Sequence, residues 1–131
     1  MSLTYLQELP SSIKDSFDHN FSFFPNIDLH VHKGLSQEIL PTLAYSLPAH
    51  LYDFIYIDGS HSSPDTFVDA FYADKLLKKG GVLIFDDFLW KDPTLPLPID
   101  SPGAAISFYA HLYGHKYTLL NQGYQVALRK N

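Results

Sequence analysis

Apolar and polar positions change their period several times along the chain, and each change predicts a different element. Residues 27–32 alternate apolar and polar side chains, which is the pattern of a half-buried strand. Residues 52–57 form an almost continuous apolar run, typical of a strand covered on both faces in a parallel sheet. Residues 82–85 form a second short apolar run that ends at two aspartates. We therefore predict three strands in this part of the chain.

Helix signals lie between and after these strands. Ser36 can cap a short helix, and the sequence Ser63-Pro64-Asp65 predicts a helix start with Ser63 as the N-cap. Gly80 suits the left-handed C-cap position of that second helix. Ser101-Pro102 opens a third helix, which Gly114 closes. Helices between apolar strands are typical of right-handed crossovers that place the strands parallel.

The two ends of the chain show different patterns. Residues 117–128, with a turn at 121–123, predict a closing antiparallel hairpin. Leu6, Leu9 and Ile13 indicate a short helix broken near Pro10. An aromatic cluster follows this helix and comprises Phe17, Phe21, Phe23 and Phe24. The predicted fold is a single α/β domain over residues 1–131, with a mostly parallel sheet and a C-terminal antiparallel hairpin.

Composition excludes several classes of protein. A chain of 131 residues with 46% apolar side chains can bury a core, and it has no apolar run long enough to span a membrane. The net charge is −5 and no stripe of lysine or arginine occurs, so we expect no nucleic-acid partner. Cysteine is absent, which excludes disulfides and thiolate chemistry. No secretory signal is visible, so we expect a cytoplasmic protein.

Carboxylates follow two of the predicted strands. Asp58 ends the strand at 52–57, and Asp86 and Asp87 end the strand at 82–85. Parallel neighbours bring their carboxyl ends to one edge, where three carboxylates repel one another unless a cation lies between them. Oxygen ligands of this kind favour Mg²⁺, Ca²⁺ or Mn²⁺. The alternative is that these acids only cap the loops that follow.

Two kinds of histidine are candidates for chemistry. His61 follows Asp58 closely and could act as a general base, or it could be a loop histidine bonded to backbone. His30 and His32 lie two residues apart, as in the Asp28-x-His30-x-His32 pattern that resembles the metal strand of amidohydrolases. Those enzymes need a barrel longer than this chain, so a small metal-dependent hydrolase is a distant alternative.

Residues 52–61 together with 76–87 resemble class I S-adenosylmethionine (SAM)-dependent methyltransferases, most closely methyltransferase family 24. Residues 33–41 resemble the segment after the third strand of that family, and residues 123–126 resemble its final hairpin. The resemblance implies a Rossmann-like fold and transfer of a methyl group to a small-molecule hydroxyl. A non-enzymatic binding or assembly module on the same fold remains an alternative.

The resemblance also implies roles for individual residues. Asp58, Asp86 and Asp87 match positions that hold a divalent cation, such as Mg²⁺, beside the acceptor hydroxyl. Ser60 stands where some sugar O-methyltransferases have an acidic base, so His61 becomes the candidate base, with Asp58 as the other catalytic candidate. The matching cofactor-binding positions are Gly34, Ser36 and Asp58.

One departure from the family concerns the cofactor. The family begins with a strand, a Gly-rich loop that cradles SAM, a helix and a second strand. This sequence has no glycine before Gly34, and we expect it to start after the second strand of the family and to bind SAM weakly or not at all. One interpretation is then that the chain is inactive by itself.

The family sheet order is 3-2-1-4-5-7-6, so the strand at 52–58 normally pairs with strand 1. Without that strand, an apolar edge is left open, and open edges invite association. We predict that residues 27–32 pair directly with residues 52–58. The alternation then lets His30 and His32 face water while Leu29 and Val31 face the core. We also predict a homodimer, because 19 Phe and Tyr residues and one Trp are many for a trimmed domain to bury alone.

Overall fold

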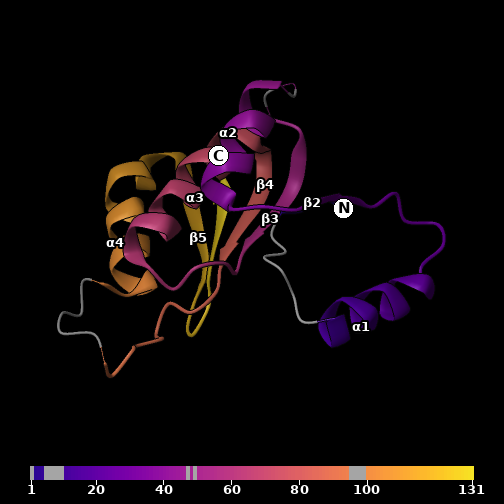
Figure 1. Cartoon of the computed structure of the whole chain (residues 1–131). Coiled ribbons are helices and arrows are strands. Elements are labelled where there is room, and N and C mark those ends of the chain that lie inside the picture. Colours follow the sequence, from indigo (N-terminus) through magenta and orange to yellow (C-terminus); the bar gives the residue numbers. More distant parts are fainter. Residues whose placement is uncertain (1, 5–10, 47, 49, 95–99) are drawn as a thin grey trace. The chain divides into compact units, whose positions relative to one another are not determined.

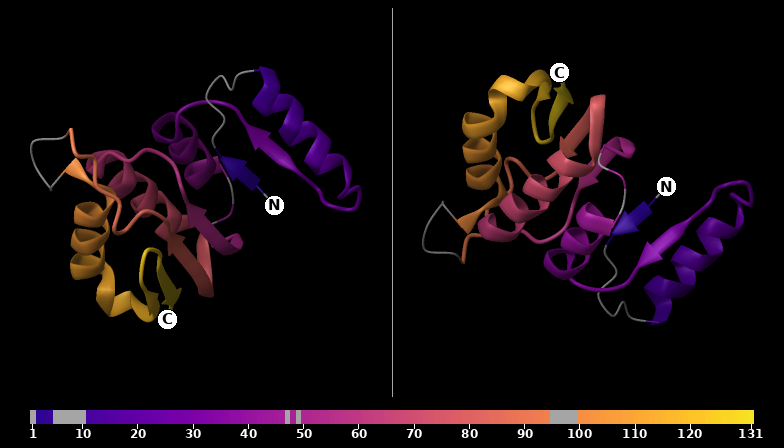
Figure 2. Two further views of the ribbon diagram at one scale, coloured as in Figure 1. Left: turned by 90° about the horizontal axis from the view of Figure 1, so that it is seen from below. Right: turned by 90° about the horizontal axis from the view of Figure 1, so that it is seen from above.

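The computed structural model describes residues 2–4, 11–46, 48, 50–94 and 100–131 (Figure 1). Leu6, Leu9 and Pro10, on which the first predicted helix partly rests, lie outside these residues. The chain divides into two compact units, Met1–Ile39 and Leu40–Asn131, and Figure 2 shows their elements from two further sides. No helix in the described ranges is long and apolar enough to cross a membrane.

The first unit contains a small parallel sheet. Strands β1 (Ser2–Thr4) and β2 (His30–His32) pair in parallel, with Ser2 opposite His30, and helix α1 (Ser11–Ser22) connects them. The partner that the structure gives β2 is β1, which the sequence did not predict, and β3 pairs with β4 in the main sheet. Pairing of residues 27–32 with residues 52–58 would join the two units and stays a prediction. A three-residue strand at the start of the chain carries too short a pattern to be found by periodicity.

The four phenylalanines of the aromatic cluster are half-buried or exposed. Phe17 and Phe21 stack along α1 with ring centroids 6.2 Å apart, while Phe23 and Phe24 are exposed. We expected His32 to face water and Val31 to face a core, but Val31 is exposed and His32 is half-buried. The alternation of residues 27–32 thus predicts the strand but assigns these two side chains to the wrong sides.

The second unit contains the main sheet. Its strands are β3 (Tyr52–Ile57), β4 (Leu77–Phe85), β5 (Tyr117–Gln122) and β6 (Val126–Lys130), in the order β3-β4-β6-β5. The β3–β4 pair is parallel, and the other two pairs are antiparallel. This mixed sheet confirms the α/β fold and the C-terminal hairpin.

Two helices of the second unit build the core against this sheet (Figures 1 and 2). Helix α3 (Ser63–Leu76) forms the predicted crossover from β3 to β4, and helix α4 (Pro102–Tyr113) leads through a 3₁₀ turn (Gly114–Lys116) into β5. Helix α2 (Ser36–Ser46) precedes β3. The largest fully buried side chains come from β4 and α4 and are Leu77, Leu83, Phe85, Ile106 and Tyr109.

Strand β3 forms one end of the main sheet and is covered on one face. Ile55 and Ile57 pack against the core, whereas Phe54 and Tyr56 are 52% and 42% exposed. The apolar run predicted burial on both faces, and for this strand that prediction is wrong. The cause is the placement of the helices, because α3 and α4 both pack on the face that carries Ile55 and Ile57. Composition of the strand alone does not distinguish one covered face from two.

The boundaries of α3 differ from those predicted. Ser62 rather than Ser63 is the N-cap, and its hydroxyl accepts a hydrogen bond from the amide of Asp65. The helix ends at Leu76, so Gly80 lies within an irregularity of β4, where it has a φ of +79°. The C-terminal carbonyls find partners elsewhere: the amide of His50 donates to Lys75 and the ammonium of Lys130 to Leu77.

Candidate functional site

Three carboxylates meet at the edge of the sheet where β3 and β4 end. Asp58 follows β3, and Asp86 and Asp87 follow β4. The amide of Asp86 donates to the carbonyl of Ile57 at 2.9 Å, which holds the two strand ends together. One carboxylate oxygen from each aspartate lies within 4.8 Å of the others. The expected convergence is thus present, and we call these residues the carboxylate cluster.

A small depression lies at the carboxylate cluster. Its volume is about 10 Å³, close to that of a single water or ion, and all three aspartates line it. Among the residues that the structure describes, no hydrogen-bond donor reaches the carboxylate of Asp58. A site of this size and donor set fits one hard cation held by oxygen ligands.

Two residues position Asp86. The phenol of Tyr56 donates to Oδ2 of Asp86 at 2.7 Å, and the amide of Gln125 donates to Oδ1 at 3.3 Å. Gln125 also donates to the Tyr56 hydroxyl at 2.9 Å, so the three groups form a closed set of hydrogen bonds. The carboxylate of Asp86 therefore has a fixed orientation before any ligand is present.

Asp87 is positioned from the hairpin and from its own backbone. The phenol of Tyr124 donates to Oδ1 of Asp87 at 2.9 Å. Asp87 has a φ of +58°, an uncommon left-handed conformation for a residue other than glycine. Its carbonyl accepts a 3.0 Å hydrogen bond from the amide of Trp90, which tightens the turn. Such strain persists only where the surroundings fix it, as the hairpin does here.

Sequence reasoning missed these positioning residues. Tyr56 precedes Asp58 by two residues on β3, so the period of the strand could have placed its side chain toward the same face. Tyr124 and Gln125 lie between β5 and β6, far from the aspartates in sequence, and no local signal connects them. Gly103 was missed too, since a Cβ there would lie 2.4 Å from the carbonyl oxygen of Phe88. Only glycine lets α4 approach the segment that follows Asp87 so closely.

The charges of the cluster shift the pKa values of its members. Burial, together with the negative charges of Asp86 and Asp87, raises the pKa of Asp58 above its ordinary value. The hydrogen bond from Tyr56 lowers the pKa of Asp86. The same hydrogen bond raises the pKa of Tyr56 to about 12, so the phenol keeps its proton at neutral pH. The carboxyl groups of Asp58 and Asp86 thus differ, because the pKa of Asp58 is raised and that of Asp86 is lowered.

His61 lies beside the cluster. Its Nε2 is 2.9 Å from Oδ2 of Asp87, and its ring stacks on Trp90 with centroids 4.3 Å apart. The loop that carries it is fixed by the N-terminus of α3, where the hydroxyl of Ser60 accepts a hydrogen bond from the amide of Ser62. The predicted position of His61 next to the acids is therefore present, and the contact with Trp90 is an addition that the sequence did not suggest.

The other predicted site residues lie in the first unit. Gly34 has a φ of +152°, and a Cβ there would lie 3.1 Å from the side chain of Ile39. Ser36 is buried and is the first residue of α2. His30 is exposed and lies 3.2 Å from Asp28. Across the described part of the chain, the carboxylate cluster is the one group of three or more acids or histidines with metal-ligand spacing, so neither His30 nor His32 joins such a group.

The sequence model of the methyltransferase-domain family 24 matches residues 7–88, which is more than half of the chain. The chain therefore belongs to this methyltransferase family. The matched region contains α1 through β4 together with Asp58, Asp86 and Asp87. No curated protein shows significant similarity to the chain.

Solved structures of O-methyltransferases have the same fold. The chain is similar to the O-methyltransferase from Bacillus cereus in complex with SAH, with a TM-score of 0.68, 19% identity, and 98% of this chain covering 62% of that one. The O-methyltransferase TomG from Streptomyces achromogenes, in complex with SAM, gives a TM-score of 0.68 at 20% identity. The similarity covers 99% of this chain and 61% of TomG. The O-methyltransferase NovP gives a TM-score of 0.65 at 18% identity, and the similarity covers 90% of this chain and 45% of NovP. The chain thus spans about half to three-fifths of the length of these proteins.

The strand order of the family accounts for the two sheets. Strands β1 and β2, joined by α1 and parallel, correspond to the second and third strands of the family order. The order β3-β4-β6-β5 corresponds to its strands 4-5-7-6. The place of β1 before β2, with α1 between them, matches the place of a second strand before a third in that order.

Proposed function

We propose that this chain carries the cation- and acceptor-binding part of a SAM-dependent O-methyltransferase that acts on a small-molecule hydroxyl. The observation that carries the proposal is the convergence of Asp58, Asp86 and Asp87 within 4.8 Å at one edge of the sheet. Family membership supports the reaction class, and the O-methyltransferase structures named above support the acceptor class.

The cluster is suited to a divalent cation such as Mg²⁺. Asp86 supplies a carboxylate oriented by Tyr56 and Gln125, and Asp87 supplies one oriented by Tyr124. Asp58 adds a carboxylate whose pKa is raised by burial and by the negative charges of Asp86 and Asp87, and a cation would offset that repulsion. A bound cation would hold the acceptor oxygen and lower the pKa of its hydroxyl. Supporting hydrogen bonds of this kind are typical of metal sites.

His61 is the proposed general base. It lies next to Asp87, and Trp90 holds the plane of its ring. In this position the imidazole can take the proton that the acceptor hydroxyl loses when its oxygen bonds to the methyl carbon. Asp87 then stabilises the imidazolium that results. Ser60 carries no acidic group, so the chain offers no carboxylate at the position where some relatives have one.

The cofactor contacts proposed for this chain are few. SAM would supply the methyl group, and Gly34, Ser36 and Asp58 are the residues proposed to contact it. We propose that these contacts alone bind SAM weakly, because the sequence has no glycine before Gly34 with which to build the family's cofactor loop. The same observation favours a second candidate function, a non-enzymatic binding or assembly module.

A thermal-shift experiment tests the cation site. Millimolar Mg²⁺ or Mn²⁺ should raise the melting temperature of the wild type, since the ion binds only the folded arrangement. Asp86→Asn should abolish the shift. Asp92→Asn is the matched control, because Asp92 is an exposed acid near the cluster that hydrogen-bonds to Thr94 instead. An equal response of wild type and Asp86→Asn would contradict the proposal.

A further inference from the structure

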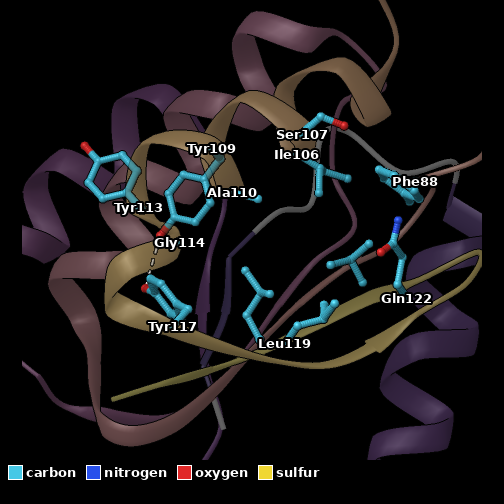
Figure 3. A pocket seen from close by; sticks show the side chains of 12 residues that line it. Phe88, Ile106, Ser107, Tyr109, Ala110, Tyr113, Gly114, Tyr117, Leu119 and Gln122 are labelled. Atoms are coloured by element: carbon cyan, nitrogen blue, oxygen red, sulfur yellow. Dashed lines mark hydrogen bonds between the residues drawn. The ribbon is translucent and has the colours of Figure 1, made fainter.

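A second site is formed by a pocket of about 310 Å³ between α4 and the β5–β6 hairpin. It shares no lining residue with the depression at the carboxylate cluster. Figure 3 shows Tyr109, Tyr113 and Tyr117 at one end, and Ser107, Phe88 and Gln122 at the other. Its volume is at the lower end of the range found for small-molecule sites.

The inner end of the pocket is apolar although tyrosines form it. The hydroxyl of Tyr109 donates to that of Tyr117 at 3.1 Å, and the hydroxyl of Tyr117 donates to Asp74 at 2.8 Å (Figure 3 draws the first of these bonds). Both phenols are therefore engaged, and burial raises the pKa of each, so they stay neutral. What they present to the pocket is mainly the surface of their rings.

The lining also excludes charged ligands. None of the side chains that line the pocket is an acid or a base, and a charge placed there would lose its hydration without a counter-charge. Ser107 and Gln122, both exposed, carry a hydroxyl and an amide that can form hydrogen bonds with a ligand at the end near Phe88. The pocket thus combines an aromatic and aliphatic interior with two polar groups at its opening.

We propose that this pocket binds a neutral, flat aromatic molecule that carries one or two hydrogen-bonding groups at its edge. The rings of Tyr109 and Tyr117 and the side chains of Ile106 and Leu119 contact its apolar body. Gln122 and Ser107 contact its polar edge. The site is separate from the carboxylate cluster, and it does not depend on the proposed methyl transfer.

Titration with 2-naphthol, followed by NMR of the backbone amides, tests the proposal. We expect saturable shifts that cluster on α4 and on β5 and β6, with a Kd at or below about 1 mM for a probe of this size. Shifts that are absent, that do not saturate, or that centre on another surface such as β3 would overturn the proposal.

Two substitutions on neighbouring residues of β5 provide a matched pair. Leu119→Trp places a larger side chain at the pocket and should weaken binding of 2-naphthol at least tenfold. Leu120→Trp is the control, because Leu120 has a similar exposure, 47% against 54%, but does not line the pocket. Gln122→Ala keeps the pocket open and should weaken binding several-fold through the lost hydrogen bond. If Leu119→Trp and Gln122→Ala both bind the probe as the wild type does, the proposal is wrong.

Discussion

The phenol of Tyr56 donates a 2.7 Å hydrogen bond to Oδ2 of Asp86, from the edge strand β3 to the end of its neighbour β4. The bond connects the exposed face of β3 with the carboxylate cluster and leaves Oδ1 of Asp86 to the amides of Gln125 and Asp87. Tyr56 belongs to the apolar run of residues 52–57, yet its hydroxyl orients the carboxylate of Asp86.

Loss of this hydrogen bond should weaken cation binding. Tyr56→Phe keeps the ring but removes the donor to Asp86, and we expect Mn²⁺ affinity to fall about tenfold, the lower end of the effect of supporting residues at metal sites. Tyr52→Phe is the control on the same strand. Isothermal titration with MnCl₂ measures both variants. Equal affinity in the wild type and Tyr56→Phe would show that Tyr56 does not position the ligand.

Local sequence signals suffice for the centre of this fold. The apolar runs at 52–57 and 82–85, with a capped helix between them, determine the β3–α3–β4 unit, and the acids that follow each strand then meet because parallel strands end at one edge. Ser101-Pro102 likewise marks the start of α4, where Ser101 is the N-cap.

Features that depend on distant parts of the chain could not be predicted in the same way. The hydrogen bonds from Tyr124 and Gln125 arise because β6 pairs with β4, which places the hairpin turn beside Asp86 and Asp87. The early end of α3 depends on His50 and Lys130, which lie outside the helix in sequence. The pairing of β2 with β1 depends on a strand of only three residues.

Binding of the cofactor by this chain should be weak. The sequence has no glycine before Gly34 with which to build the family's cofactor loop. Loss of about two charge-assisted hydrogen bonds at ~1.5–3 kcal/mol each would lower the affinity for SAM by roughly two to four decades. Calorimetry with SAM and with SAH, each in the presence and absence of Mg²⁺, should therefore detect millimolar binding or none. A micromolar Kd would contradict this prediction and remove the argument for a non-enzymatic module.

Asp74 on α3 should contribute more to stability than the exposed ion pair between Asp53 and Lys78. Its carboxylate accepts hydrogen bonds from Tyr117 at 2.8 Å and Lys116 at 3.1 Å, and Lys130 lies 3.3 Å away. Asp74→Ala should cost about 2–4 kcal/mol, because it leaves the buried hydroxyl of Tyr117 without its acceptor and removes the counter-charge of Lys130. The control Asp53→Ala breaks only the exposed pair with Lys78 and should cost about 0–1 kcal/mol. Urea unfolding at pH 7 measures both values.

The pH dependence of stability should report on the same residue. Burial raises the pKa of Asp74, but the hydrogen bonds from Tyr117 and Lys116 and the charge of Lys130 outweigh this, so the pKa lies below its ordinary value of 3.8. A pKa that is lower in the folded state stabilises the protein above pH 3.8, and this stabilisation is lost as the pH falls through the folded value. Between about pH 5 and pH 2, the range in which carboxyl groups titrate, the wild type should therefore lose more stability than Asp74→Asn. Parallel curves for the two proteins would show that Asp74 does not contribute in this way.

The exposed face of β3, the end strand of the main sheet, should support a homodimer. Phe54 is 52% exposed on the end strand of its sheet, and apolar edge strands tend to associate through their unpaired backbone groups. We expect light scattering on a size-exclusion column to give about twice the 14.9 kDa of one chain. Phe54→Lys should shift the protein toward the monomer, because a charge on an edge strand opposes pairing. Phe108→Lys is the control, since Phe108 is 55% exposed but lies on α4. A wild type that remains monomeric across dilution would exclude the dimer, and dissociation by Phe108→Lys alone would place the interface on α4 instead of β3.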